Sequence, residues 1–173
     1  MKKIVVLASL FLPTLALAGN TINFQGEVSS QTCKVDINGN DSNPVVLLPT
    51  VPTTSLSAPG AAAGQTDFTI RLTGCEAAPT GGTEIKTVFV ANSLTKDGNI
   101  VNTGTAKNVA LQLLDPAAPA NPFDLAGGYK ASGLVLEAGK TTAEHKFAVR
   151  YYAEGAATVG SVLGSVQYAV SYL

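Results

Sequence analysis

Residues that carry most enzyme chemistry are scarce in this sequence. Its 173 residues include no Trp, one His, one Met and two Cys, and only 13% are charged. The one candidate base for a nucleophilic triad, His145, lies between Glu144 and Lys146 in an alternating run, which indicates a strand edge or a solvated position. A copper or zinc enzyme on a β scaffold needs several histidines. We therefore expect no enzyme activity, with no catalytic residue, metal site or cofactor.

Charge of either sign is also too sparse to form a recognition surface. Eleven basic and twelve acidic residues leave no basic stripe that could neutralise phosphates, so we expect no nucleic-acid partner. Asp36, Asn38, Asn40 and Asp41 surround Gly39, but their spacing does not match a calcium loop and no Glu closes it. This cluster predicts an ordinary turn.

Long apolar runs are missing except at the N-terminus. Lys2 and Lys3 precede an apolar run from Ile4 to Leu12, and Ala16-Leu17-Ala18 places small residues where a signal peptidase reads them. A membrane anchor would need about 20 apolar residues, roughly twice this length. We expect residues 1–18 to be a secretory signal peptide and the mature chain to begin at Gly19.

Export changes the interpretation of the two cysteines. In an oxidising compartment, Cys33 and Cys75 are expected to form a disulfide. Its loop of about 42 residues would stabilise the fold by roughly 4 kcal/mol in the chain-entropy model. A metal site would need more ligands than two cysteines and the distant His145.

The remaining sequence predicts one all-β domain. Short alternating apolar runs are separated by turn residues, which is the pattern of an antiparallel β-sandwich rather than of helices. Residues 49–66 and 115–122 are Pro-rich loops, and Lys96–Asn99 is a hairpin turn. The candidate strands and apolar runs are Thr21–Ser29, Thr32–Ile37, Val45–Leu48, Phe68–Leu72, Thr87–Val90 with Val88 and Val90 paired on one side, Val109–Leu113, Leu134–Leu136, His145–Tyr151 and Gly160–Tyr172.

The first candidate strand has a glycine in the middle of its apolar face. Ile22, Phe24, Gly26 and Val28 share that face, and a glycine inside a strand costs about 0.5–1 kcal/mol relative to Ala. One interpretation is a bulge in an ordinary first strand. The other is a strand that slides into a groove where a side chain would clash.

The last candidate strand alternates without interruption up to Tyr172. Ending a chain inside a strand places its carboxylate beside a sheet edge, and an unprotected apolar edge can pair with another chain. The alternative is a C-terminal strand placed centrally in a sheet.

Several motifs, in a fixed order, resemble one family. They are Phe24–Val28 followed by Cys33, Val46-Leu47 and Thr66–Leu72 before Cys75, Asn108–Asp115, and Phe147–Gly160. In addition, Gly160 is the fourteenth residue from the C-terminus and Tyr172 is the penultimate one. With these motifs, the chain resembles the pilin subunits of Gram-negative chaperone–usher fimbriae, especially the type 1 major pilin class. It departs from the family's pattern at Glu154, where Thr is common, and at Val159, where Pro is common.

The resemblance implies an immunoglobulin-like β-sandwich that lacks its seventh strand. In this family a periplasmic chaperone fills the open groove with its own strand and binds the subunit's C-terminal carboxylate. At the outer-membrane usher, the N-terminal extension of the next subunit displaces that strand. Residues 19–31 would then be the donor-strand extension and 32–173 the pilin domain.

The resemblance also assigns roles to particular residues. Ile22, Phe24 and Val28 would fill a neighbour's groove, with Gly26 at its narrow position. The groove edge that the chaperone first binds would include Gly160, Val166, Tyr168, Val170, Tyr172 and Leu173.

From these features we expect the protein to be a structural subunit of a cell-surface fimbria that supports adhesion. We expect it to be exported through the periplasm to the cell surface. Its partners would be identical or related pilin subunits, the chaperone and the usher, with any host receptor unidentified. A rod subunit is favoured over a minor tip or adaptor subunit. The alternative is a fimbrial adhesin or a lectin-like binding module. The mature chain is too short for the separate receptor-binding domain of tip adhesins, and 6% aromatic residues without Trp argue against a sugar-stacking site.

Overall fold

The computed structural model describes Gly26, Val28, Ser29 and residues 33–172, and these form an all-β domain. The only helix in this part of the chain is the short 3₁₀ helix η1, Thr53–Leu56, and none is long and apolar enough to cross a membrane. The strands are β1 Lys34–Ile37, β2 Ala62–Thr73, β3 Thr83–Val90, β4 Ile100–Val101, β5 Val109–Leu114, β6 Tyr129–Leu136, β7 Ala143–Ala153 and β8 Gln167–Ser171.

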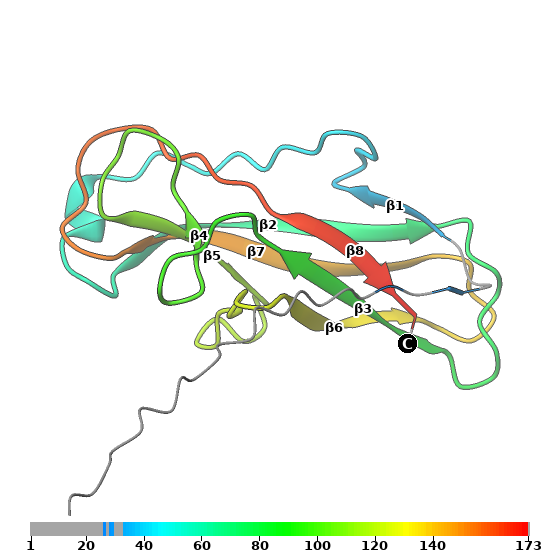
Figure 1. Cartoon of the computed structure of the whole chain (residues 1–173). Helices are drawn as coiled ribbons and strands as arrows, with labels where there is room; N and C mark the ends of the chain where they lie inside the picture. The colour runs from blue at the N-terminus through cyan, green and yellow to red at the C-terminus, as the bar shows by residue number, and fades with distance from the viewer. Residues whose placement is uncertain (1–25, 27, 30–32, 173) are drawn as a thin grey trace, which may run out of the picture.

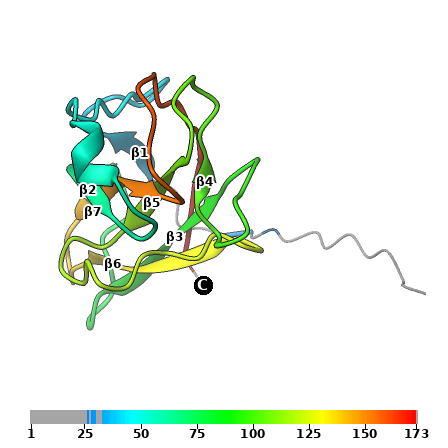
Figure 2. The ribbon, with the colours of Figure 1, turned by 90° about the vertical axis from the view of Figure 1, so that its left-hand side faces the viewer.

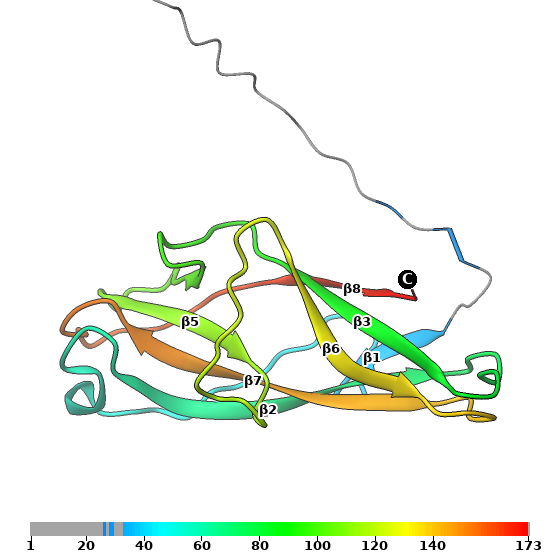
Figure 3. The ribbon, with the colours of Figure 1, turned by 90° about the horizontal axis from the view of Figure 1, so that it is seen from below.

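The strands form two sheets that pack face to face as a sandwich. One sheet has the order β1-β2-β7-β5-β4 and the other β6-β3-β8, and neighbouring strands are antiparallel in both (Figure 1). Figure 2 shows the sandwich along its length, and Figure 3 shows β6, β3 and β8 as one layer against β2, β7 and β5. The expected all-β sandwich is confirmed.

The core forms where the alternating apolar faces of the two sheets meet. Phe68 and Ile70 of β2 are buried against Phe147 of β7, as their alternation predicts. The rings of Phe89 and Phe147 meet edge to face with their centroids 5.2 Å apart, a favourable geometry for aromatic pairs. Aromatic packing therefore joins β3 of one sheet to β7 of the other.

The structure corrects one detail of the sequence analysis and refines two others. β2 begins at Ala62, inside the expected loop 49–66. Val88 and Val90 share one side of β3, as expected; this is the outer side, and Ile85, Thr87 and Phe89 are buried on the inner side. Apolar residues on both sides of this strand make its alternation ambiguous. His145 lies in the part of β7 that pairs with β2 but not with β5, so it is at a local strand edge as expected, and its side chain is half-buried.

The C-terminal segment passes from one sheet to the other. Only Gln167–Ser171 forms a strand, and it pairs with β3. The preceding residues instead bind the loop between β4 and β5. The Thr103 amide donates to the Leu163 carbonyl at 2.8 Å, and the Ala106 amide donates to the Ser161 carbonyl at 3.0 Å. The unbroken strand expected over Gly160–Tyr172 is thus an irregular segment bound to the β4–β5 loop, followed by the short strand β8.

Candidate functional site

The edge strands β1 and β8 border an open seam between the two sheets. In the described part of the chain, β8 pairs only with β3 and β1 only with β2. Residues 43–51 continue from β1 along the seam (Figure 1) and, among the described residues, make no backbone hydrogen bond. Among the described residues, 43–51 on one border and 167–170 on the other therefore have no strand partner on the side that faces the seam.

An apolar hollow of about 200 Å³ lies in the middle of this seam. Val46 and Leu48 line it on one side, and Val166 and Tyr168 line it on the other. Its floor is the sandwich core, made of Ile37, Phe68, Phe89, Ile100, Leu113 and Val149. The hollow thus exposes the interior of the domain along a line between the two edges.

The border formed by residues 44–48 alternates like a strand although it pairs with none. Val46 and Leu48 pack on the core, whereas Val45 and Leu47 are 74% and 82% exposed. This period of two is that of an extended chain with one face toward a core. The segment has the side-chain pattern of a strand and lacks a partner that would make it one.

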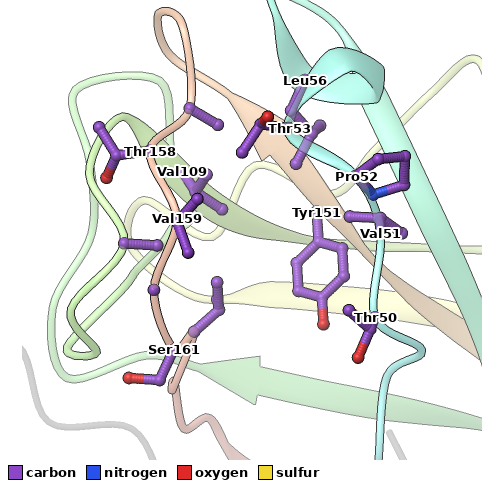
Figure 4. A pocket seen from close by; sticks show the side chains of 14 residues that line it. Thr50, Val51, Pro52, Thr53, Leu56, Val109, Tyr151, Thr158, Val159 and Ser161 are labelled. Carbon is purple, nitrogen blue, oxygen red and sulfur yellow. The ribbon is translucent and has the colours of Figure 1, made fainter.

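A second hollow, of about 490 Å³, lies at the η1 end of the seam (Figure 4). Val51 and Leu56 line one side, Val159 and Ser161 line the other, and the Tyr151 ring projects between them. Val162 also lines this hollow. Burial raises the pKa of the Tyr151 hydroxyl, so it is neutral at ordinary pH. We call the two hollows together the seam groove, because the same two segments border them. Residues 44–48 and 165–168 line the central hollow, and residues 50–56 and 157–162 line the one at η1.

The opposite end of the seam is closed by a contact between the two ends of the domain. The amide of Cys33 donates to the hydroxyl oxygen of Tyr172 at 3.2 Å. Val170 and Tyr172 pack against the cluster of Leu72, Cys75 and Leu136. Cys33 and Cys75 form the expected disulfide, with their Cα atoms 4.5 Å apart.

Two described residues of the predicted donor strand, Gly26 and Val28, are exposed. Val28 is fully exposed, and the Gly26 position has no atom within 4 Å of where a β-carbon would lie. Ile22, Phe24 and Leu173 lie outside the described residues. The structure does bring together Val166, Tyr168, Val170 and Tyr172, which form one side of the seam.

Gly160 lines the end hollow, and the structure gives a reason for its identity. A β-carbon at this position would lie 2.3 Å from the amide nitrogen of Ala106. Since real β-carbons do not approach backbone so closely, only glycine lets the C-terminal segment bind the β4–β5 loop. Gly160 therefore shapes the groove by a contact within its own chain.

Sequence reasoning missed half of the groove. Val46, Leu48, Val51, Tyr151 and Val162 were not expected there. Residues 45–48 are all apolar and are flanked by Pro44 and Pro49. Their alternation between core and solvent is therefore not visible in the sequence. A strand-like reading of this run would have found Val46 and Leu48, because residues two positions apart in an extended chain share a face. Pro44, Val46 and Leu48 then fall on one face, and Val45 and Leu47 on the other.

His145 makes a structural contact. Its Nε2 lies 3.3 Å from Oδ2 of Asp115, and its ring meets the Phe147 ring edge to face. The close approach of Gly133, where a β-carbon would lie 2.4 Å from the imidazole, leaves room for the ring. Among the residues that the structure describes, no three His, Cys, Asp or Glu side chains are grouped so that they could hold a metal ion.

Comparison with known protein families matches residues 22–173 to the family described as Fimbrial protein. The F17 fimbrial protein of Escherichia coli is 36% identical, over 92% of this chain and 89% of that protein. The type-1 fimbrial protein A chain of Escherichia coli K12 is 33% identical, over 98% and 96%. The minor fimbrial subunit HifD of Haemophilus influenzae is 32% identical, over 93% and 77%.

Among solved structures, the crystal structure of the P pilus rod subunit PapA matches with a TM-score of 0.59. The match covers 81% of this chain and 99% of that chain at 12% identity, so it concerns the fold alone. The open seam fits an incomplete immunoglobulin-like sandwich.

Proposed function

The chain belongs to the fimbrial protein family and is a fimbrial subunit of the chaperone–usher type, and we propose that it polymerises head to tail by donating and accepting a β-strand. The observation that supports this proposal is the seam groove. It reaches the apolar core between residues 167–170 of β8 and residues 44–51, which, among the described residues, have no strand partner on that side. A strand inserted there would pair with both β8 and residues 44–51, at about 4.8 Å from each.

The occupant of the groove is the N-terminal extension, residues 19–31, of the next subunit. Ile22, Phe24 and Val28 would enter the hollows, and Gly26 would pass a position too narrow for a side chain. Each large apolar side chain that leaves water in this way contributes about 1.5–3 kcal/mol. Because the subunit's own Val28 is fully exposed, it is available for donation.

The two ends of the groove set the direction of the donated strand. The continuously described domain begins at Cys33, at the end of the seam that the Tyr172 contact closes, whereas the second hollow lies at the η1 end. If the donor's domain lay at the closed end, it would meet the acceptor's own extension there. In a junction that repeats along a filament, the donor's domain would therefore lie beyond η1. The donated strand would then run antiparallel to β8, with Val28 near the hollow at the η1 end.

The regions of the chain follow from this mechanism. Residues 1–18 would be the signal peptide, 19–31 the donor extension and 32–173 the pilin domain. During passage through the periplasm, a chaperone strand would occupy the same groove and hold the C-terminal carboxylate until the usher presents the next subunit. We propose a rod subunit rather than a tip or adaptor subunit, because the resemblance to type 1 major pilins extends over nearly the whole mature chain.

The proposal is tested by thermal unfolding of a shortened chain that starts at Thr32, with and without a synthetic peptide of residues 19–31. At a hundredfold excess over Kd, ligand binding stabilises a protein by about 2.7 kcal/mol, which raises Tm by about 5–10 °C for a domain of this size. We expect a saturable rise of this order, and a smaller one when the peptide carries Gly26→Val. A high Tm that ignores the peptide would mean that the sandwich is complete by itself.

A further inference from the structure

We propose that Asn38 is a site of spontaneous deamidation, which the hairpin turn after β1 keeps inert in the folded subunit and which reacts once that turn opens. Asn38-Gly39 is the one Asn-Gly pair of the sequence. The inference concerns a single chain and does not depend on strand donation.

The reaction needs only these two residues and water. The Gly39 backbone nitrogen attacks the Cγ atom of the Asn38 side chain, its proton passes to the departing amide group, and ammonia leaves. Water then opens the resulting five-membered succinimide ring at either carbonyl. The product at position 38 is aspartate or isoaspartate, and isoaspartate carries an added methylene in the main chain. Glycine favours the attack, because it has no side chain beside its nitrogen and its backbone reaches many conformations.

Residues 37–40 form a two-residue hairpin turn at the end of β1 (Figure 1). The Ile37 amide donates to the Asn40 carbonyl at 2.9 Å, and the Asn40 amide donates to the Ile37 carbonyl at 3.0 Å. Asn38 and Gly39 have φ of +52° and +83°, so the turn is of type I′, for which Asn-Gly is a preferred pair. In this type, ψ of the first central residue is about +30°, which directs the next nitrogen away from that residue's own β-carbon. Ring closure therefore requires Asn38 to leave its turn conformation.

Hydrogen bonds hold the two reacting groups apart, each to a different partner. Oδ1 of Asn38 accepts from the Thr69 amide at 2.8 Å, which keeps the side chain against β2. The Gly39 amide donates to Oδ1 of Asp36 at 2.7 Å. The Arg71 guanidinium lowers the pKa of the Asp36 carboxyl, so this acceptor is ionised at neutral pH and forms a strong bond. The attack would break both the Asn38–Thr69 and the Gly39–Asp36 bond.

Deamidation would alter the path of the chain into the seam groove. Aspartate at position 38 would place a second carboxylate two positions from Asp36, and isoaspartate would also lengthen the main chain of a turn that admits two residues. From this turn the chain runs into residues 44–48, which border the central hollow. Modified subunits would therefore carry a loosened border on that side.

The test follows the chain that lacks residues 1–18 at neutral pH, in buffer and in guanidinium chloride. Mass spectrometry of its peptides measures aspartate and isoaspartate at position 38. Because the turn opens before the reaction, we expect deamidation of the folded chain to be at least about tenfold slower than that of the unfolded chain. Equal rates, or no product at position 38 in the unfolded chain, would overturn the inference.

Asp36→Ala removes the acceptor of the Gly39 amide, and Asp41→Ala is the matched control. Asp41 is exposed beside the same turn, and its side chain has no hydrogen bond or ion pair with the described residues. We expect Asp36→Ala to speed deamidation of the folded chain about three- to tenfold, as for the loss of one hydrogen bond. Asp41→Ala should leave the rate unchanged, and both variants should match the wild type in guanidinium chloride.

Two results with these variants would contradict the proposed restraint. An unchanged rate in folded Asp36→Ala, or equal acceleration by both variants, would mean that the Gly39–Asp36 bond does not hold the turn inert. A slower reaction in Asp36→Ala would mean that the carboxylate acts as a base for the attack, which is the opposite of a restraint.

Discussion

Gly164 lies so close to Leu111 that a β-carbon on Gly164 would come within 2.7 Å of the Leu111 Cδ1 atom. This contact marks the place where the C-terminal segment leaves the β4–β5 loop and moves toward β3. Gly160, four residues earlier, makes a similar approach to Ala106. The border of the seam groove therefore depends on two glycines that let the backbone contact its neighbours directly.

Gly160→Ala should destabilise the domain. The added methyl group would force residues 158–163 away from the β4–β5 loop and weaken their hydrogen bonds, at a cost of about 1–3 kcal/mol. Chemical unfolding measures this loss. Gly26→Ala is the control, because its β-carbon meets nothing in its own chain and should leave the unfolding free energy unchanged. Equal stability of the two variants would contradict the close-approach account of Gly160.

Val46→Ala and Val45→Ala should separate the inner and outer faces of the groove border. Val46 lines the central hollow, whereas Val45 points to solvent. We expect Val46→Ala to weaken binding of the 19–31 peptide about tenfold, or about 1.4 kcal/mol, from lost apolar contact. Val45→Ala should bind the peptide like the wild type in a fluorescence titration. A larger loss of peptide binding in Val45→Ala than in Val46→Ala would contradict the proposal, because it would mean that the peptide contacts the outer face of residues 44–48.

Gly26→Val should block filament assembly without altering the subunit that carries it. The valine would meet the groove of the neighbour, while its own domain has no atom near this position. Electron microscopy and isolation of the chaperone complex measure the two effects. We expect few or no filaments and a normal amount of complex, and normal filaments would remove our account of Gly26.

Replacing both cysteines by serine should lower the unfolding free energy by about 4 kcal/mol in the chain-entropy model, since the bond closes a loop of 42 residues. Urea unfolding of the oxidised wild type and the double variant measures this difference. The reduced wild type is the control and should unfold like the double variant. A stable reduced chain would show that packing around Tyr172 suffices to hold β1.

Acid should weaken the pairing of β1 with β2. The Arg71 guanidinium donates a hydrogen bond to Asp36 at 3.2 Å and lowers the pKa of that carboxyl. The stabilisation is therefore present above the unfolded pKa of about 3.9 and is lost as the pH falls through the lower folded value. The pair is exposed, so the effect should be small. Asp36→Asn should flatten the dependence of Tm on pH below about 4, and an unchanged slope would contradict this assignment.

Much of the fold could be predicted from the sequence because its alternation is strict where one face is buried. Phe68, Ile70 and Leu72 show this in β2, and the even pair of cysteines predicted the disulfide. The sequence did not show which face of β3 is the inner one, because Val88 and Val90 are as apolar as Phe89. The division of the last strand could not be predicted, since it depends on contacts between Gly160 and Ala106, which are 54 positions apart.

The groove was predicted on one side only. Val166, Tyr168, Val170 and Tyr172 alternate in the sequence and line the seam, whereas Val46 and Leu48 lie in a run without apparent alternation. Their inward orientation results from the path of the chain after β1, which the sequence pattern does not specify. Strand donation and the roles of Ile22, Phe24 and Leu173 remain predictions.

The alternation of Val45–Leu48 has a consequence for the fidelity of assembly. An extended chain that enters the groove shifted by one residue would turn Asn23, Gln25 and Glu27 toward the apolar floor and expose Phe24, because neighbouring side chains point to opposite faces. Burying these polar groups without partners would cost several kcal/mol. Pro44 and Pro49 also lack amide hydrogens, which limits the hydrogen bonds that a misaligned chain could gain. The groove is therefore expected to reject out-of-register strands before they become links of the filament.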